Sequence, residues 1–225
     1  TKFIPDYNSV IPSSPYIEDL TGLTVVNIRH VPLSNTGKAL IKRMADVVGS
    51  LLLIILFSPL MIICALLIKI TDRGPAIFTQ ERVGLHNRNF MMYKFRSMRL
   101  QVSDEELKGW TRKGDPRVTG IGRFIRRTSL DELPQLINVI RGEMSLVGPR
   151  PPLPSEVNQY DLWQRRRLSM KPGLTCLWQI KPNRNDLSFN EWMSLDLNYI
   201  DNWSLKMDFS ILFQTALVVF GAQGR

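Results

Sequence analysis

The sequence predicts a mostly helical α/β fold, in which a long apolar helix is attached to a small mixed domain. Three observations lead to this prediction. Residues 47–68 form an uncharged apolar run, residues 76–83 and 90–98 have the composition of short strands, and apolar residues recur at helical spacing over 130–141. The chain has 225 residues, of which 44% are hydrophobic and 22% charged, enough for one ordinary domain with attached elements.

The first 37 residues have the composition of a linker. Prolines stand among Ser, Asn and Thr, which is typical of extended segments, and residues 24–28 are predicted to form one strand. We favour a tether without chemistry for residues 1–37. Because no signal sequence precedes Thr1, we expect the chain to be part of a longer protein.

Residues 47–68 are the segment most typical of a membrane helix. They are 22 residues without a charge, long enough for a helix to cross roughly 30 Å of hydrocarbon. In the middle of the run, Pro59 lacks a backbone donor, and the Ser58 hydroxyl can bond a carbonyl that the proline leaves free. A sharp bend is therefore expected at Ser58-Pro59.

Basic residues flank this run on both sides, and the positive-inside rule places such flanks in the cytoplasm. They are Lys38, Lys42, Arg43, Lys69, Arg73, Arg82 and Arg88. A helix that enters the membrane, breaks at Ser58-Pro59 and returns to the same face satisfies both flanks. A proline-kinked helix that crosses the bilayer is the alternative. We favour the re-entrant arrangement, with residues 38–70 as the membrane element and residues 71–225 as the domain outside it.

The composition narrows the possible chemistry. Lys and Arg number 29 against 20 for Asp and Glu, a net charge of +9, which indicates anionic partners such as nucleic acid, acidic lipid or phosphorylated substrates. Cys64 and Cys176 are too far apart for a CxxC site, and two cysteines make no disulfide framework. The two histidines argue against a His-based metal cluster and a Ser-His-Asp triad. We therefore expect any catalytic acid or base to be a carboxylate.

A short amphipathic helix is predicted over about 130–141, with Gly142 as its stop. Asp131 and Glu132 stand at its start. In one interpretation, Ser129 and Glu132 form a capping box, and both acids only complement the helix dipole. In the other, the two carboxylates hold a divalent cation while arginines bind a diphosphate. The arginines in and near this segment are Arg123, Arg126, Arg127, Arg141 and Arg150.

A second apolar helix is predicted over 207–221, with aromatic residues before it. Trp192, Tyr199 and Trp203 could anchor an interfacial helix at a membrane surface. A helix packed in the core of the domain fits the same pattern. Both interpretations stay open from the sequence.

Several segments resemble, in order, the motifs of the monotopic phosphoglycosyl transferases, also called bacterial sugar transferases. They are SPLM, GPAIFTQERVG, YKFRSM, GDPRVTGIGRFIRRTSLDELPQLINVIRGEMSLVGPRP, KPGLT, WQI and YIDNWS. The similarity covers about residues 38–223. It implies a monotopic membrane protein with a re-entrant broken helix, a small mixed catalytic domain and interfacial amphipathic helices. It also implies a place in the bacterial inner (cytoplasmic) membrane, with the catalytic domain on the cytoplasmic face.

The resemblance assigns roles to particular residues. Asp131 and Glu132 match the catalytic dyad of a family that requires Mg²⁺, so both roles, catalysis and metal binding, are expected of them. The residues expected to bind or lie near the substrate phosphates are Arg126, Arg150, Lys94 and Arg96. For Lys94 and Arg96, a structural ion pair is the alternative.

The implied activity is transfer of a hexose-1-phosphate from a UDP-sugar to undecaprenyl phosphate, with release of UMP and a covalent aspartyl-phosphosugar intermediate. UDP-glucose or UDP-galactose is the expected donor, because the preceding linker resembles that of long family members, and the product would initiate exopolysaccharide, capsule or O-antigen synthesis. Cys176 and Lys181-Pro182 depart from the family pattern beside the expected sugar site.

The partners that this implies are the UDP-sugar, undecaprenyl phosphate and membrane lipids, but no nucleic acid. A homo-oligomer is left open. Two alternatives are a membrane-anchored basic protein that binds nucleic acid or acidic lipid, and a conventional glycosyltransferase that releases UDP.

Overall fold

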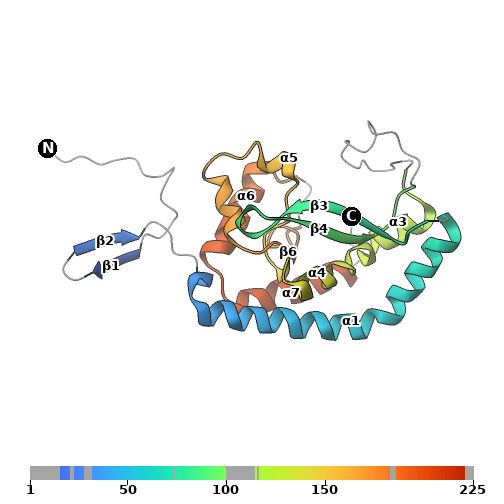
Figure 1. Ribbon diagram of the computed structural model, residues 1–225, viewed down its shortest axis with the longest axis horizontal. Coiled ribbons are helices and arrows are strands. Elements are labelled where there is room, and N and C mark those ends of the chain that lie inside the picture. The colour runs from blue at the N-terminus through green and yellow to red at the C-terminus, as the bar shows by residue number, and fades with distance from the viewer. Residues whose placement is uncertain are drawn as a thin grey trace.

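The computed structural model describes residues 16–20, 23–27, 32–72, 74–99, 115, 117–182 and 186–220. Figure 1 shows a long helix along the lower edge, with a strand hairpin and shorter helices above it. The helices are α1 (Thr36–Asp72), α3 (Gly120–Arg127), α4 (Gln135–Arg141), α5 (Pro154–Val157), α6 (Phe189–Asp201) and α7 (Leu205–Phe220). The 3-10 turns are η1 (Pro32–Ser34), η2 (Leu85–Asn87), η3 (Leu130–Glu132) and η4 (Gln164–Ser169). The strands are β1 (Tyr16–Leu20), β2 (Leu23–Asn27), β3 (Ile77–Val83), β4 (Asn89–Phe95), β5 (Ser145–Val147) and β6 (Gly173–Thr175).

The described strands form three two-stranded sheets. β1 and β2 pair antiparallel, so the strand predicted over 24–28 is confirmed, while its partner β1 was not predicted. β3 and β4, which cover the two predicted strands, also pair antiparallel, from Ile77 opposite Phe95 to Val83 opposite Asn89. β5 and β6 pair in parallel, with Val147 opposite Thr175. Each predicted strand was thus found, and the short parallel pair is an addition.

α1 is one continuous helix of 37 residues that contains Pro59. It begins after Asn35, whose side-chain Oδ1 accepts hydrogen bonds from the backbone N–H groups of Gly37 and Lys38. The Ser58 hydroxyl donates to the carbonyl of Ile55 at 3.0 Å, as expected of a serine beside a proline. Figure 1 shows the helix bending partway along, so that its second half turns up toward α3. The predicted bend is present, but the helix is bent rather than broken.

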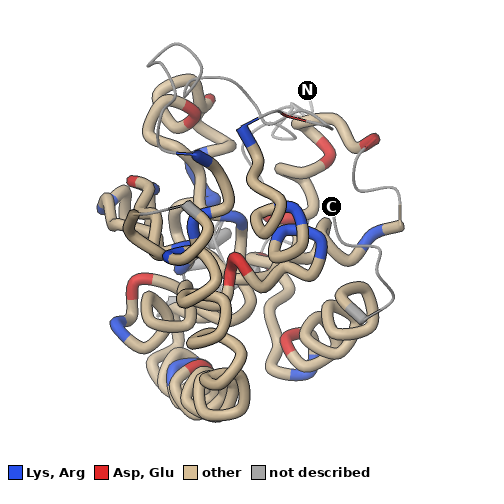
Figure 2. The backbone as a smooth tube through the Cα atoms, turned by 90° about the vertical axis from the view of Figure 1, so that its right-hand side faces the viewer, with Lys and Arg blue, Asp and Glu red and all other residues tan. Residues whose placement is uncertain are grey.

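The surface of α1 is largely apolar and exposed. Ile55, Leu56 and Ile70 are 70%, 69% and 77% exposed. By length and composition α1 could cross a membrane, and only 11% of its most apolar window is buried within the chain. In Figure 2 the basic residues gather mainly away from the lower edge, where the helices are mostly uncharged. Such a surface is typical of a helix that contacts lipid.

The second half of α1 packs against the domain that follows it. Cys64 and Ile68 form a buried cluster with Phe95 at the end of β4 and Ile125 on α3. Leu130, the residue before the predicted dyad, packs against the same cluster. The apolar helix therefore supports the segment that carries the acidic pair.

The helix predicted over 207–221 is α7. It is partly buried in the core and partly exposed, so it has features of both a core helix and an interfacial helix. Ile211 is buried in the main core, whereas Phe209 and Phe213 are 61% and 67% exposed. The proposed anchoring role is wrong for Tyr199 and Trp203, because both side chains are buried and bonded inside the domain.

Candidate active site

The acidic pair lies on η3, in a short turn between α3 and α4. The amphipathic helix predicted over 130–141 is therefore divided, with α4 beginning only at Gln135. Gly142 ends α4 with a φ of 85°, as predicted. The capping-box interpretation is wrong. Ser129 has a left-handed backbone and its side chain makes no capping bond, and its N–H donates instead to the carbonyl of Arg126.

Glu132 is paired with Lys94 of β4. The Lys94 ammonium lies 3.0 Å from the Glu132 Oε1, and the two side chains are 21% and 22% exposed. Asp131 is buried beside them on the same turn, with 8% exposure. The structure thus brings together three of the predicted site residues, and the predicted ion pair is confirmed for Lys94. A cation next to Glu132 also lowers the repulsion between two adjacent carboxylates.

Asn138 fixes α4, and with it the acidic pair, against β4. Its side chain is fully buried. The side-chain Oδ1 accepts from the Tyr93 N–H at 3.0 Å, and the Nδ2 donates to the Met91 carbonyl at 2.8 Å and to Glu143 at 2.7 Å. Asn138 was not predicted as a site residue, although a single amide inside the apolar segment LINVI indicates such a contact.

Arg126 lies in the last turn of α3, which packs against η3. The start of α3 is capped by Thr119, whose hydroxyl accepts from the Gly122 N–H at 2.9 Å. A Cβ at Gly122 would lie 2.0 Å from the Ser97 carbonyl oxygen, so this position requires glycine. The close approach holds α3, and therefore Arg126, against the segment that follows β4.

Arg96 has a different environment from Lys94. It is 5% exposed and follows β4, with its backbone N–H donating to the Ala76 carbonyl at 2.8 Å. Its side chain is therefore buried in the domain, whereas Lys94 is partly exposed.

Arg150 stands in the loop after β5, and β3 holds this loop. The Arg82 guanidinium donates to the Pro151 carbonyl and the Val83 N–H donates to the Pro152 carbonyl, both at 3.0 Å. The Arg150 guanidinium lies over the ring of Trp192 on α6, 5.9 Å from its centroid. The structure thus places Arg150 against α6, while Lys94 and Glu132 meet between β4 and η3.

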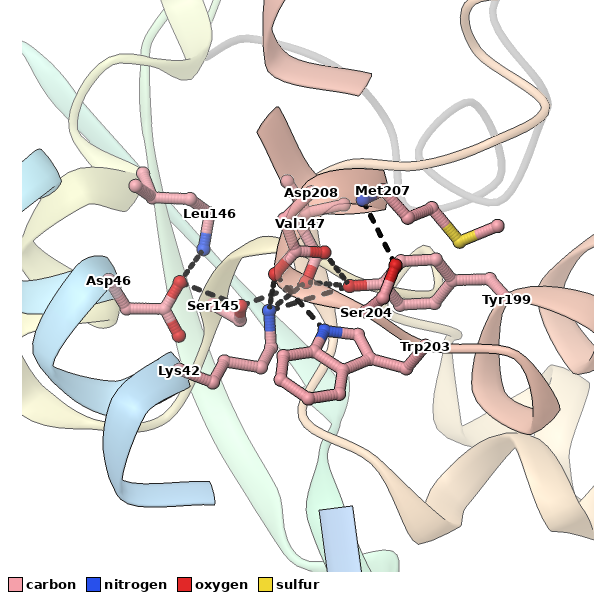
Figure 3. Close-up of polar contacts among 10 residues, drawn as sticks. All are labelled: Lys42, Asp46, Ser145, Leu146, Val147, Tyr199, Trp203, Ser204, Met207 and Asp208. Atoms are coloured by element: carbon pink, nitrogen blue, oxygen red, sulfur yellow. Dashed lines mark hydrogen bonds and ion pairs between the residues drawn. The ribbon is translucent and has the colours of Figure 1, made fainter. Parts of the chain in front are cut away.

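A buried polar network joins α1 to α7 and to the strand before Arg150 (Figure 3). Lys42 lies 2.7 Å from Asp208 and donates to the Val147 carbonyl at 3.1 Å. Tyr199 and Trp203 donate to the two oxygens of the same carboxylate at 2.6 and 3.1 Å. Burial raises the pKa of the Tyr199 hydroxyl well above its ordinary value, so it stays a donor. Lys42 was expected as a flanking cytoplasmic charge, but it is a buried structural one.

Asp46, one turn further along α1, extends this network to β5. Its carboxylate accepts from the Ser145 hydroxyl at 2.9 Å and from the Leu146 N–H at 3.0 Å. Neither Lys42 nor Asp46 was singled out as a contact from the sequence, because their partners lie about a hundred residues away or more.

The acidic pair offers only part of the ligand set that a magnesium ion needs. In the described part of the chain, no group of three or more His, Cys, Asp and Glu side chains could hold a metal by itself. Mg²⁺ is commonly bound by one or two carboxylates together with substrate phosphates. Asp131 and Glu132, adjacent on one turn beside Lys94, offer such a partial set.

Comparison with known proteins agrees with the motifs. The sequence pattern of a family described as "Bacterial sugar transferase" matches residues 37–222. The chain is 45% identical over 208 residues to the undecaprenyl-phosphate galactose phosphotransferase of Salmonella typhimurium, covering 85% of this chain and 43% of that protein. It is 39% identical over 224 residues to the UDP-glucose:undecaprenyl-phosphate glucose-1-phosphate transferase of Escherichia coli, covering 96% of this chain and 48% of that protein.

A third relative is shorter. The exopolysaccharide production protein ExoY of Rhizobium meliloti is 41% identical over 198 residues, which are 81% of this chain and 87% of that protein. The chain thus spans less than half of the Salmonella and Escherichia proteins but most of ExoY. The matched region contains the acidic pair, Lys94 and the apolar helix. The chain belongs to the bacterial sugar transferase family.

Proposed function

We propose that this protein transfers a hexose-1-phosphate from a UDP-sugar to undecaprenyl phosphate. The observation that carries the proposal is the Lys94–Glu132 pair, which fixes the acidic turn against β4 beside the buried Asp131. The names of the Salmonella and Escherichia relatives, a galactose phosphotransferase and a glucose-1-phosphate transferase that act on undecaprenyl phosphate, support this substrate class. The name of ExoY, an exopolysaccharide production protein, agrees with a role in polysaccharide synthesis.

The proposed reaction has two displacements at one phosphorus atom. An oxygen of the Asp131 carboxylate attacks the sugar-bearing phosphorus of the UDP-sugar, the bond to the bridging oxygen breaks, and UMP leaves with that electron pair. The phosphosugar remains on Asp131 as a mixed anhydride. An oxygen of undecaprenyl phosphate then attacks the same phosphorus, the bond to Asp131 breaks, and the carboxylate is restored. The product is a lipid diphosphate sugar.

The neighbouring charged residues would each have a separate role in these steps. Arg126 and Arg150 would bind the phosphate oxygens, because a guanidinium donates two hydrogen bonds in one plane. Lys94 would hold Glu132 in place, and Glu132 would position or deprotonate the incoming lipid phosphate. Mg²⁺, held by Asp131, Glu132 and the donor phosphates, would neutralise part of the phosphate charge.

The apolar helix would bring the active site to the lipid substrate. We propose that α1 enters the cytoplasmic leaflet of the bacterial inner membrane, bends near Pro59 and returns to the cytoplasmic face. The bend and the exposed apolar surface of α1 support this arrangement. The isoprenoid tail would then stay in the leaflet while its phosphate reaches the acidic turn.

Cysteine labelling tests this topology. The variants Lys38→Cys and Ile70→Cys place thiols at exposed positions near the two ends of α1, and both natural cysteines are buried. In intact cells, an impermeant maleimide should label neither variant, and it should label both after the cells are opened. Labelling of one end only in intact cells would mean that α1 crosses the bilayer.

Release of UMP tests the reaction itself. Purified protein is incubated with undecaprenyl phosphate, Mg²⁺ and UDP-glucose or UDP-galactose, and the nucleotide product is identified. We expect UMP from one of these donors, and its loss in Asp131→Asn and Glu132→Gln. Asp161→Asn, which changes an exposed acid, serves as the control. Release of UDP would indicate a conventional glycosyltransferase, and failure to turn over any UDP-sugar would indicate a binding protein.

A further inference from the structure

A buried ion pair lies near Arg150 and does not belong to the acidic turn. Arg167 of η4 and Asp196 of α6 are 2.7 Å apart, with side chains 4% and 1% exposed. Arg167 also donates to the Tyr160 hydroxyl at 2.8 Å. A buried pair of this kind adds little stability compared with apolar residues of the same volume. Stability alone therefore does not explain why this ion pair is present.

Arg150 lies close to Asp196, and both its charge and its backbone N–H favour the ionised form of the Asp196 carboxylate. Trp192, one turn earlier on α6, lies beneath the Arg150 guanidinium at 5.9 Å. The Trp192 ring is itself stacked on Trp178, with centroids 4.9 Å apart and an interplanar angle of 16°. α6 thus places both Trp192 and Asp196 next to Arg150.

The rest of this loop is held from the other side. β3 binds the carbonyls of Pro151 and Pro152, as described above. Gly148 lies so close to the segment that leads into β6 that a Cβ there would meet the Lys171 carbonyl oxygen at 2.5 Å. Arg150 stands between these fixed neighbours, and its guanidinium lies against α6.

We propose that Asp196 is a positioning residue for catalysis, which orients Arg150 toward the phosphate of the sugar donor with the help of Trp192. This inference rests on the proposed function, in which Arg150 binds donor phosphate. Arg167 keeps the Asp196 carboxylate ionised and in place. Asp196 does not touch the substrate.

Because Asp196 can be protonated, its proposed role predicts that binding of the sugar donor depends on pH. Burial raises the pKa of Asp196 to about 6, although Arg167 and Arg150 act in the opposite direction. The other titratable groups that face it, Tyr160 of the loop before η4 and Cys176 after β6, have pKa values raised by burial and stay neutral. Above pH 6 the carboxylate is charged and holds Arg150. As the pH falls through 6 it becomes protonated, and donor binding should weaken.

The first test compares two acids on the same helix. Asp196→Asn removes the charge behind Arg150, whereas Asp201→Asn removes an acid paired with Arg166, away from Arg150. For Asp196→Asn we expect kcat/KM for the UDP-sugar to fall about tenfold, the loss expected for one charge-assisted hydrogen bond. KM for undecaprenyl phosphate should be unchanged, and the decline in kcat/KM near pH 6 should disappear. Asp201→Asn should keep that decline.

A double-mutant cycle separates positioning from general destabilisation. If Asp196 acts through Arg150, then Asp196→Asn should change kcat/KM little in the Arg150→Ala background. Equal effects of Asp196→Asn in both backgrounds would overturn the proposal, and so would an unchanged pH profile. Trp192→Leu, at a half-buried position, provides a second variant if Asp196→Asn does not fold, and it should show the same dependence on Arg150.

Different results would exclude the proposed transfer reaction and the proposed role of Asp196. If the unaltered chain releases no UMP, the proposed function fails. If the unaltered chain is active and Arg150→Ala has normal kinetics, or if Arg150→Ala is impaired but Asp196→Asn is normal, only the inference fails.

Discussion

Two neighbouring carboxylates on one turn repel each other, and the contact between Lys94 and Glu132 reduces that repulsion. The ammonium lies 3.0 Å from one oxygen of Glu132, at a site about one-fifth exposed. At such exposure an ion pair contributes only about 0.2–1 kcal/mol to stability. Its main effect should therefore be on the geometry and charge of the acidic turn.

Replacing Lys94 tests this effect. We expect Lys94→Met to lower kcat by about tenfold to a hundredfold, the range typical when a residue that orients a ligating carboxylate is removed. The melting temperature should change little. Lys94→Arg keeps the charge and should retain more activity. Steady-state kinetics of UMP release and thermal unfolding in the same detergent give both quantities, and full activity of Lys94→Met would rule out the role.

The site residues differ in how far the sequence could predict them. Asp131, Glu132 and Lys94 were predicted because they stand in motif segments. Asn138 and Asp196 were not, because their roles arise from contacts with β4 and Arg150, which only the folded chain brings together. The capping interpretation failed because η3 and α4 are separate elements.

The position of Arg126 depends on the close contact between helix α3 and the segment after strand β4. Gly122→Ala would place a methyl group 2.0 Å from the Ser97 carbonyl oxygen, and backbone atoms would have to move. Overpacking of this kind costs about 1–3 kcal/mol. Gly120→Ala is the matched control, because a Cβ there meets no atom within 4 Å. Thermal unfolding should show a clear loss for Gly122→Ala only, and equal behaviour of the two variants would contradict the contact.

The attachment of α1 depends on its buried polar residues. Lys42→Met would leave the carboxylate of Asp208 buried without its ammonium partner, which typically costs about 3–5 kcal/mol. Lys38→Met, one turn earlier at an exposed position, should be nearly neutral.

Adding Asp208→Asn to Lys42→Met should recover part of the lost stability, because the unpaired charge is removed. Unfolding in detergent measures all of these variants. A loss in Lys42→Met no larger than in Lys38→Met would show that the network does not secure the helix.

The elements themselves were largely predictable, since composition and periodicity are local properties. The strands β3 and β4 and the helices α1 and α7 lie where the sequence indicated. A helix that continues through Pro59 was only the alternative to the favoured break. The parallel pair of β5 and β6, next to which Gly173 approaches Gly148 closely, was not predicted. Such contacts depend on how distant segments meet.

In the whole molecule, α1 packs against the segments that carry the acidic turn and the loop of Arg150. The second half of α1 packs on Ile125 and Phe95, next to Leu130, while its first half is bonded to β5 and α7. A movement of α1 would therefore reach both the acidic turn and the loop of Arg150. This arrangement suits the proposed reaction, in which one substrate is lipid-bound and the other is soluble.

We propose that Asp131 becomes covalently attached to the phosphosugar during turnover. The most direct measurement uses a UDP-sugar labelled in its β-phosphate, incubated with the protein and Mg²⁺ in the absence of undecaprenyl phosphate. We predict that label appears on the protein, is released by hydroxylamine as expected for an acyl phosphate, and is absent in Asp131→Asn. An active protein that never acquires label, or label that persists in Asp131→Asn, would contradict the account.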